Sequence, residues 1–259
     1  MKPSIAPVSS GYYPDHTCLL YRPCAENAKK TPIIGLFAIR NECKRLPNHT
    51  TGSTSFIVKY IAKEEGLYNL FISNGFINKK PLLELCKVLH AANIDLKSID
   101  DAIYRKLNGG YLKPVLRTLM TLNEQGIHFE IATLVIPGYV DDPEMLKQMC
   151  GWILNNLGPD YPLHFLRFFP KYKLDRLPPT PISTLTRFRQ LALAEGIHYV
   201  YVGNVPGHEG NHTYCHNCKK LLIERQGYSI PTYNLKENQC KFCNTSIPGV
   251  WQAARDNPI

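Results

Sequence analysis

Hydrophobic and polar positions along residues 51–205 follow two alternating periods. Runs rich in β-branched and aromatic residues predict strands, and stretches with an apolar residue every three or four positions predict amphipathic helices. The strands are expected at 67–73, 92–96, 127–135, 163–168 and 197–202, and the helices at 54–65, 80–90, 99–108, 112–125, 142–156 and 181–195. Because strand and helix alternate, the sequence predicts an α/β fold with a mainly parallel sheet.

Two flanking segments depart from this pattern. Residues 1–50 are rich in Pro, Ser, Asn and Lys and contain one candidate strand at 33–41, whereas residues 206–259 contain paired cysteines. The chain is therefore expected to have three parts: an irregular segment 1–50, a βα body 51–205 and a small tail 206–259.

The tail contains two Cys-x-x-Cys pairs, Cys215 with Cys218 and Cys240 with Cys243. Two such turns can direct four thiolates at one ion, and four protein ligands leave no open position, so the spacing predicts a structural zinc site. An iron-sulfur cluster at the same cysteines is the alternative. A segment of this size buries too little apolar surface to fold securely alone, so a metal is the expected source of stability.

Other residues of the tail fit a small metal-stabilised ribbon. The runs 221–225 and 228–235 predict a hairpin between the two cysteine pairs. The nearby histidines His208, His212 and His216 are expected to be exposed or to support the ligands rather than to bind the metal.

Composition and charge narrow the class of protein. The hydrophobic content of 44% in 259 residues can form a sizeable core, and the longest apolar run, residues 33–39, is too short to cross a bilayer. No secretory signal pattern opens the chain, so a cytoplasmic protein with reduced cysteines is expected. The net charge of +9 is spread along the chain, so neither a membrane nor a nucleic acid is the expected partner.

Polar or turn-forming residues follow several predicted strands. They are Asn74 and Gly75, Asp95 and Lys97, Pro137 and Gly138, and the run 167–173. The carboxyl ends of parallel strands are where such folds bind ligands. Asp95 and Lys97 face one side of their strand, so they can hold a zwitterionic or ribose-bearing ligand, or simply pair with each other. The Asn-Gly and Pro-Gly dipeptides are equally typical of ordinary turns.

Five runs of sequence carry a resemblance to a known family: NLFISNGF, LHAANIDLKSIDDAIYRKLNGGYLKPVLRTL, TLVIPGYVDD, RFFPKYKLDRLPPTP and YVYVGNVPGHEGNHTYCHNC. Together they resemble the radical S-adenosylmethionine (SAM) enzymes related to pyruvate formate-lyase activating enzyme. Within these enzymes the chain is most similar to the AmmeMemoRadiSam subgroup. The resemblance extends from Thr51 to Trp251.

The resemblance implies a partial (βα) barrel of the radical SAM type, followed by a zinc-ribbon-like tail. In that family a four-iron four-sulfur cluster and SAM lie at the carboxyl ends of the strands. Reductive cleavage of SAM there yields a 5'-deoxyadenosyl radical that abstracts hydrogen from a substrate. The residues that the resemblance places near the cofactor are Asn74, Gly75, Asp95, Lys97, Pro137 and Gly138.

The sequence departs from the family where the cluster should bind. The family holds its cluster with a CxxxCxxC loop, and this sequence contains none; Cys18, Cys24 and Cys43 are too widely spaced to form one. Phe169 also stands where the family usually has His. Three explanations fit: a fragment or mispredicted gene model that has lost its first two βα units, a real chain whose missing strands are supplied by a partner chain, or a decayed paralogue kept for binding.

Two hypotheses about function follow. The first is a radical SAM enzyme whose barrel is incomplete at its N-terminal end, which acts on an unidentified small-molecule or protein substrate and is inactive alone. The alternative is a non-catalytic zinc-ribbon scaffold that binds a protein or nucleic-acid partner.

Overall fold

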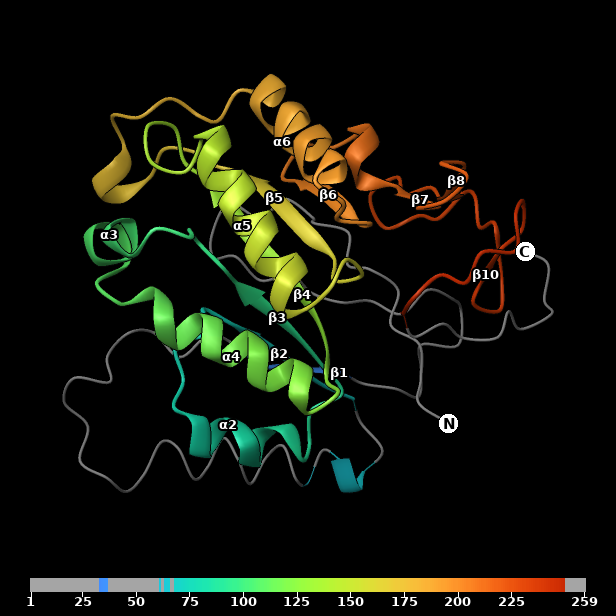
Figure 1. Ribbon diagram of the computed structural model, residues 1–259, viewed down its shortest axis with the longest axis horizontal. Helices are drawn as coiled ribbons and strands as arrows, with labels where there is room; N and C mark the ends of the chain where they lie inside the picture. The colour runs from blue at the N-terminus through green and yellow to red at the C-terminus, as the bar shows by residue number, and fades with distance from the viewer. Residues whose placement is uncertain (1–32, 37–60, 62, 66–67, 250–259) are drawn as a thin grey trace. The chain divides into compact units, whose positions relative to one another are not determined.

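The computed structural model describes residues 33–36, 61, 63–65 and 68–249, and within them the predicted α/β fold is confirmed (Figure 1). The strands of the main sheet are β1 (Ile33–Leu36), β2 (Tyr68–Ser73), β3 (Ala91–Asp95), β4 (His128–Val135), β5 (Leu163–Arg167) and β6 (Val200–Gly203). Their order in the sheet is their order in the chain. Every pair of these strands with a defined register is parallel.

Helices connect the strands as the periodicity predicts. They are α2 (Lys79–Cys86), α3 (Asp101–Ile103), α4 (Leu112–Glu124), α5 (Pro143–Asn156) and α6 (Ile182–Ala194). The predicted helix 99–108 differs in detail, because it consists of α3 and a π-helical turn that Gly109 ends with a left-handed φ of 61°. Asp142 caps α5 through its side chain, and Pro143 occupies the first turn, as the sequence predicts.

Some predictions concern residues outside the described ranges. These residues include 1–32 and 37–60, with most of the predicted helix 54–65 and the cysteines Cys18, Cys24 and Cys43. Of the candidate strand at 33–41, residues 33–36 form β1.

The chain divides into two compact units, one formed by Ala25–Ala132 and one that contains Thr133–Ile259. The tail thus belongs to the same unit as β5 and β6. The predicted division at residues 205 and 206 stays a prediction.

In the unit Ala25–Ala132, α2 packs against α4, and their buried side chains include Leu82, Leu85 and Leu119. Gly75, directly after β2, is buried with a φ of +71°, and a Cβ at this position would lie 2.9 Å from Ile94 Cγ2 and 3.0 Å from Val115 Cγ1. Only glycine combines this backbone conformation with such close packing.

In the unit that contains Thr133–Ile259, α5 and α6 pack against each other, and α6 also packs against β5 and β6. The rings of Phe165 on β5 and Phe188 on α6 meet edge to face, with centroids 5.6 Å apart. Part of the hydrophobic core of this unit therefore lies between the sheet and the helices α5 and α6.

The tail forms two small antiparallel pairs, β7 (Thr213–Tyr214) with β8 (Leu221–Ile223) and β9 (Leu235–Lys236) with β10 (Gln239–Cys240). The runs 221–225 and 228–235 lie side by side, since Ile223 pairs with Tyr233 in antiparallel orientation. The predicted hairpin is confirmed, and β7 and β10 extend it on either side.

Among the described residues, no helix has the length and apolar character needed to span a membrane.

Candidate metal centre and strand-end residues

All four cysteines of the tail converge on one point. One ligand atom from each of Cys215, Cys218, Cys240 and Cys243 lies within 4.8 Å of the others. Sulfur–sulfur distances are 3.7 Å both for Cys215 with Cys243 and for Cys218 with Cys240. A tetrahedral site with metal–sulfur bonds of ~2.3 Å requires sulfurs about 3.8 Å apart. The geometry therefore fits a four-thiolate zinc site, and metal binding itself stays a prediction.

The two halves of the centre have the same backbone turn. Cys215 N donates to Lys220 O, and Lys219 N donates back to Cys215 O. Cys240 N donates in the same way to Thr245 O, and Asn244 N donates to Cys240 O. The residue after each second cysteine has a left-handed φ, 59° at Lys219 and 58° at Asn244. This repeated turn is what directs two thiols of each pair toward one point.

Neighbouring polar groups support the thiols. Thr245 Oγ1 lies 3.2 Å from Cys243 Sγ, and Asn217 Nδ2 donates to the same hydroxyl at 2.9 Å. Hydrogen bonds from Thr245 lower the pKa of the Cys243 thiol to about 6. Burial raises the pKa of the Cys215 thiol, so its thiolate form requires a cation beside it.

The metal centre shares its hydrophobic core with β6. Cys215 and Cys240 are buried in one cluster with Leu222, Leu235 and other tail residues, and this cluster also contains Tyr199 and Tyr201. Tyr201 lies on β6, and Tyr199 directly precedes that strand. The tail core is therefore continuous with the end of the sheet.

The free edge of β6 is capped by side chains. Among the described strands, β6 is the last in the sheet. Arg189 Nε on α6 donates to Val200 O at 3.1 Å, and Asn211 Nδ2 in the tail donates to Val202 O at 2.7 Å. Unpaired carbonyls of an edge strand invite pairing with other chains. The tail and α6 together satisfy two of them.

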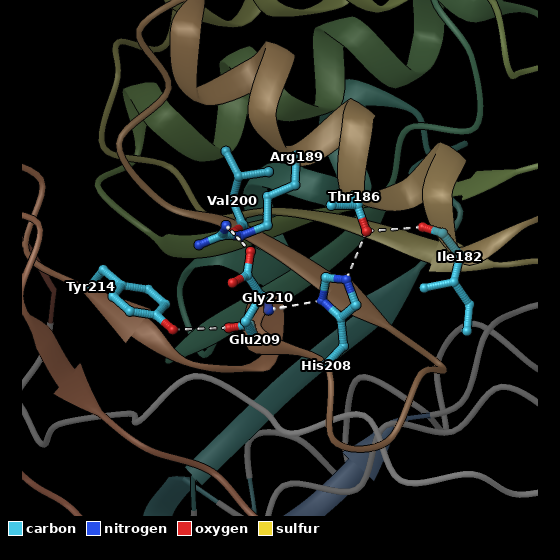
Figure 2. Close-up of polar contacts among 8 residues, drawn as sticks. All are labelled: Ile182, Thr186, Arg189, Val200, His208, Glu209, Gly210 and Tyr214. Atoms are coloured by element: carbon cyan, nitrogen blue, oxygen red, sulfur yellow. Dashed lines mark hydrogen bonds and ion pairs between the residues drawn. The ribbon is translucent and has the colours of Figure 1, made fainter.

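A short 3₁₀ turn, Glu209–Asn211, holds the tail against α6 (Figure 2). His208 Nε2 lies 2.9 Å from Thr186 Oγ1 on α6, and His208 Nδ1 accepts the Gly210 N–H at 2.8 Å. A Cβ on Gly210 would lie 2.9 Å from atoms of Arg189, His208 and Val202. Only glycine allows the turn to approach β6 this closely.

The three histidines near the cysteines have other partners. His208 holds α6, His212 Nδ1 accepts the Arg225 N–H at 3.0 Å, and His216 Nδ1 lies 2.8 Å from the Tyr199 hydroxyl. Within the described residues, none of them belongs to the group of potential metal ligands.

Arg225 has a role that sequence reasoning missed. Its side chain is buried, and Nη1 donates to Asn211 O and to Thr213 Oγ1, each at 2.9 Å. Its guanidinium lies over the Tyr201 ring, 5.7 Å from the centroid. A single arginine after the run LLIE, two positions beyond the apolar residues 221–223, was the available indication.

Asp95 and Lys97 lie together at the carboxyl end of β3. Lys97 Nζ is 2.8 Å from Asp95 Oδ2, and each side chain is about one-third exposed, at 33% and 34%. The Tyr104 hydroxyl accepts the Lys97 N–H at 2.9 Å, and burial raises the pKa of this hydroxyl, which therefore stays protonated. Tyr104 thus anchors the backbone beside the pair, and both charged side chains stay partly exposed.

The other strand-end residues form turns. Asn74 Oδ1 accepts the Phe76 N–H at 3.0 Å, and the neighbouring Gly75 O accepts the Thr118 hydroxyl at 2.7 Å. In the other unit, Pro137 and Gly138 form the turn after β4, and Gly138 N donates to Asp141 Oδ1 at 2.9 Å. Their roles at a cofactor stay predictions.

The described residues do not provide a cluster site of the radical SAM kind. Their single group of three or more potential ligands is the set of four tail cysteines, which would leave no open position. Cys86 and Cys150 are buried and stand outside that group.

Comparisons with known proteins agree with the fold. No protein-family model matches the chain. An uncharacterized protein of Methanocaldococcus jannaschii is 42% identical over 217 residues, which are 81% of this chain and 64% of that protein. Pyruvate formate-lyase 1-activating enzyme of Escherichia coli is 25% identical over 140 residues, which are 49% of this chain and 56% of that enzyme. The chain thus spans less than two thirds of either relative.

A solved domain of pyruvate-formate lyase-activating enzyme from Bacteroides vulgatus matches the structure with a TM-score of 0.52 and 15% identity, covering 59% of this chain and 91% of that domain. The chain therefore has an α/β, partial-barrel fold of the radical SAM type, and its cysteine cluster fits a zinc-ribbon-like tail. Both features were predicted from the sequence. Membership of the AmmeMemoRadiSam subgroup stays a prediction.

Loss of one thiol should remove the metal from the tail. We expect about one zinc per chain in the wild type, measured by mass spectrometry after anaerobic purification, and much less in Cys215→Ser. The control, Cys86→Ser, changes a cysteine outside the cluster and should keep its zinc. Iron bound in place of zinc and lost with Cys215 would contradict the assignment of the metal.

Gly210→Ala should destabilise the chain by about 2 kcal/mol, because the added methyl group meets three fixed neighbours. The control is Gly151→Ala on α5, where a Cβ meets no atom within 4 Å and helix propensity favours alanine by up to about 1 kcal/mol. Urea unfolding of both variants measures the difference. Equal stability of the two would contradict the tight approach of the turn to β6.

Proposed function

We propose that this chain binds SAM at the carboxyl end of β3 as a protein of the radical SAM type. The observation that carries the proposal is the partly exposed pair of Asp95 and Lys97 at the end of a strand in a fold of that type. Sequence similarity to an E. coli activating enzyme supports the same assignment.

The chemistry of the pair suits the ligand. The methionine part of SAM carries an ammonium and a carboxylate, and its ribose carries hydroxyl groups. Asp95 can accept hydrogen bonds from the ammonium or the ribose, and Lys97 can donate to an oxygen. An ion pair that is one-third exposed contributes little stability, so opening it for a ligand costs little.

Cleavage of SAM would need a cluster that supplies one electron, and the printed sequence contains no CxxxCxxC loop. We therefore propose that this polypeptide alone binds SAM without cleaving it, and that a partner chain supplies the cluster for cleavage. The finer assignment to the AmmeMemoRadiSam subgroup, the cytoplasmic location and a small-molecule or protein substrate belong to the same proposal.

A non-catalytic zinc-ribbon scaffold is the second candidate. The closed set of four thiols favours it, because such a site has a structural rather than a catalytic role. It would bind a protein partner, or a nucleic acid, and would show no affinity for SAM.

Calorimetric titration with SAM separates these candidates. We expect saturable binding by the wild type, and about tenfold weaker binding by Asp95→Asn and by Lys97→Met, since each loses a charge-assisted hydrogen bond. The matched control is Glu84→Gln, which breaks an exposed ion pair of 2.7 Å on the same unit and should leave the affinity unchanged.

Two results would overturn the proposal. Absence of SAM binding by the full chain would favour the scaffold. Formation of 5'-deoxyadenosine by this polypeptide alone under a strong reductant would show that it holds a cluster after all.

A further inference from the structure

A groove of about 420 Å³ lies between α6, the start of β6 and the first half of the tail. Its polar lining includes Arg189, His198, His212, His216 and Lys219. All of these residues belong to one compact unit. Asp95 and Lys97 do not line this groove, so it needs a separate explanation.

Two cationic side chains, Arg189 and Lys219, line the groove. The Arg189 side chain is only 12% exposed, and its Nε–H bond to Val200 O fixes the guanidinium in place. The ammonium of Lys219 donates to His216 O at 2.6 Å, which keeps it over the first cysteine turn. A cation held as firmly as Arg189 loses little side-chain entropy when an anion binds.

His212 adds a neutral donor to the lining. Its Nδ1 accepts the Arg225 N–H at 3.0 Å, so the neutral ring carries its proton on Nε2. Burial, with Arg225 and Arg189 nearby, lowers the pKa of this imidazole despite the opposing carboxylate of Glu224. The ring can therefore donate one hydrogen bond to an oxygen acceptor near neutral pH.

The carboxylate of Glu209 already lies beside the Arg189 guanidinium. Glu209 Oε1 is 3.4 Å from Arg189 Nη1, and Figure 2 shows the two groups facing each other beside Tyr214. The Glu209 side chain is 63% exposed, so the pair is long, solvated and weak. An external oxyanion that also reaches Lys219 can displace it.

We propose that this groove is a binding site for a small ligand that carries a carboxylate or phosphate group. Arg189 and Lys219 bind the oxyanion. Glu209 pairs with the Arg189 guanidinium when the ligand is absent. Lys219 follows directly after Cys218, one of the four cysteines of the candidate metal centre. The site is therefore built jointly by the first cysteine turn of the tail and by α6.

The test uses the zinc-loaded full chain, titrated with pyrophosphate and with citrate as separate probes. We expect at least one of them to bind saturably and to shift the amide resonances of Gly210 and Lys219. The tighter probe identifies phosphate or carboxylate as the group that the groove prefers.

Three variants locate the binding. Lys219→Gln should weaken it about tenfold by removing one charge-assisted hydrogen bond. Lys241→Gln is the matched control, because this lysine also donates to a tail carbonyl, Tyr233 O at 3.0 Å, but lies outside the groove. Glu209→Gln should strengthen binding several-fold, since it removes the competing carboxylate.

Zinc content and urea unfolding confirm that each variant is folded. Absence of saturable binding to both probes would overturn the proposal, as would equal losses in the two lysine variants. Tighter binding of a single-stranded oligonucleotide, weakened by both lysine variants, would show a nucleic-acid surface instead. None of these results depends on SAM binding, so this inference can fail while the proposed function stands.

Discussion

Closure of the free edge of β6 is the constraint on which the second half of this structure depends. A parallel sheet that ends in an open strand presents unpaired carbonyl groups, and here Arg189 and Asn211 occupy two of them. The tail can reach that edge only because Gly210 leaves room for the 3₁₀ turn against Val202. The tail is therefore a structural part of the sheet's edge as well as a separate motif.

The four thiols explain how so short a tail can close the free edge of β6. Its strands β7, β9 and β10 have two residues each, so regular pairing contributes little. Two identical cysteine turns bring the thiols together instead, and Cys215 and Cys240 join Tyr199 and Tyr201 in one core. A metal that fixes the thiols would thus also fix the end of the sheet.

The sequence predicts the repeating parts of the molecule well, because their signals are local. The strand at 127–135 and the helix at 142–156 agree with β4 and α5 to within a residue, and the cysteine spacing predicts the thiol cluster. Contacts between distant elements were not predictable in this way. Neither the contact of Arg225 with the Tyr201 ring nor the groove has a local pattern. The first arises where the tail packs on β6, and the second where the tail also meets α6.

The strand-end residues and the cysteine tail differ in how well the sequence predicts their roles. Position at the end of a strand is what predicts these residues as ligand contacts, and the structure gives several of them ordinary turn roles. Asp95 and Lys97 therefore remain the strongest candidates for ligand contact. The central claim concerns the tail: a metal held by its four thiols would stabilise β6. Hydrogen exchange with and without a zinc chelator tests it most directly. Chelation should speed amide exchange in β6 and the tail while β2 and β3 stay protected; unchanged protection of β6 after zinc removal would contradict the account.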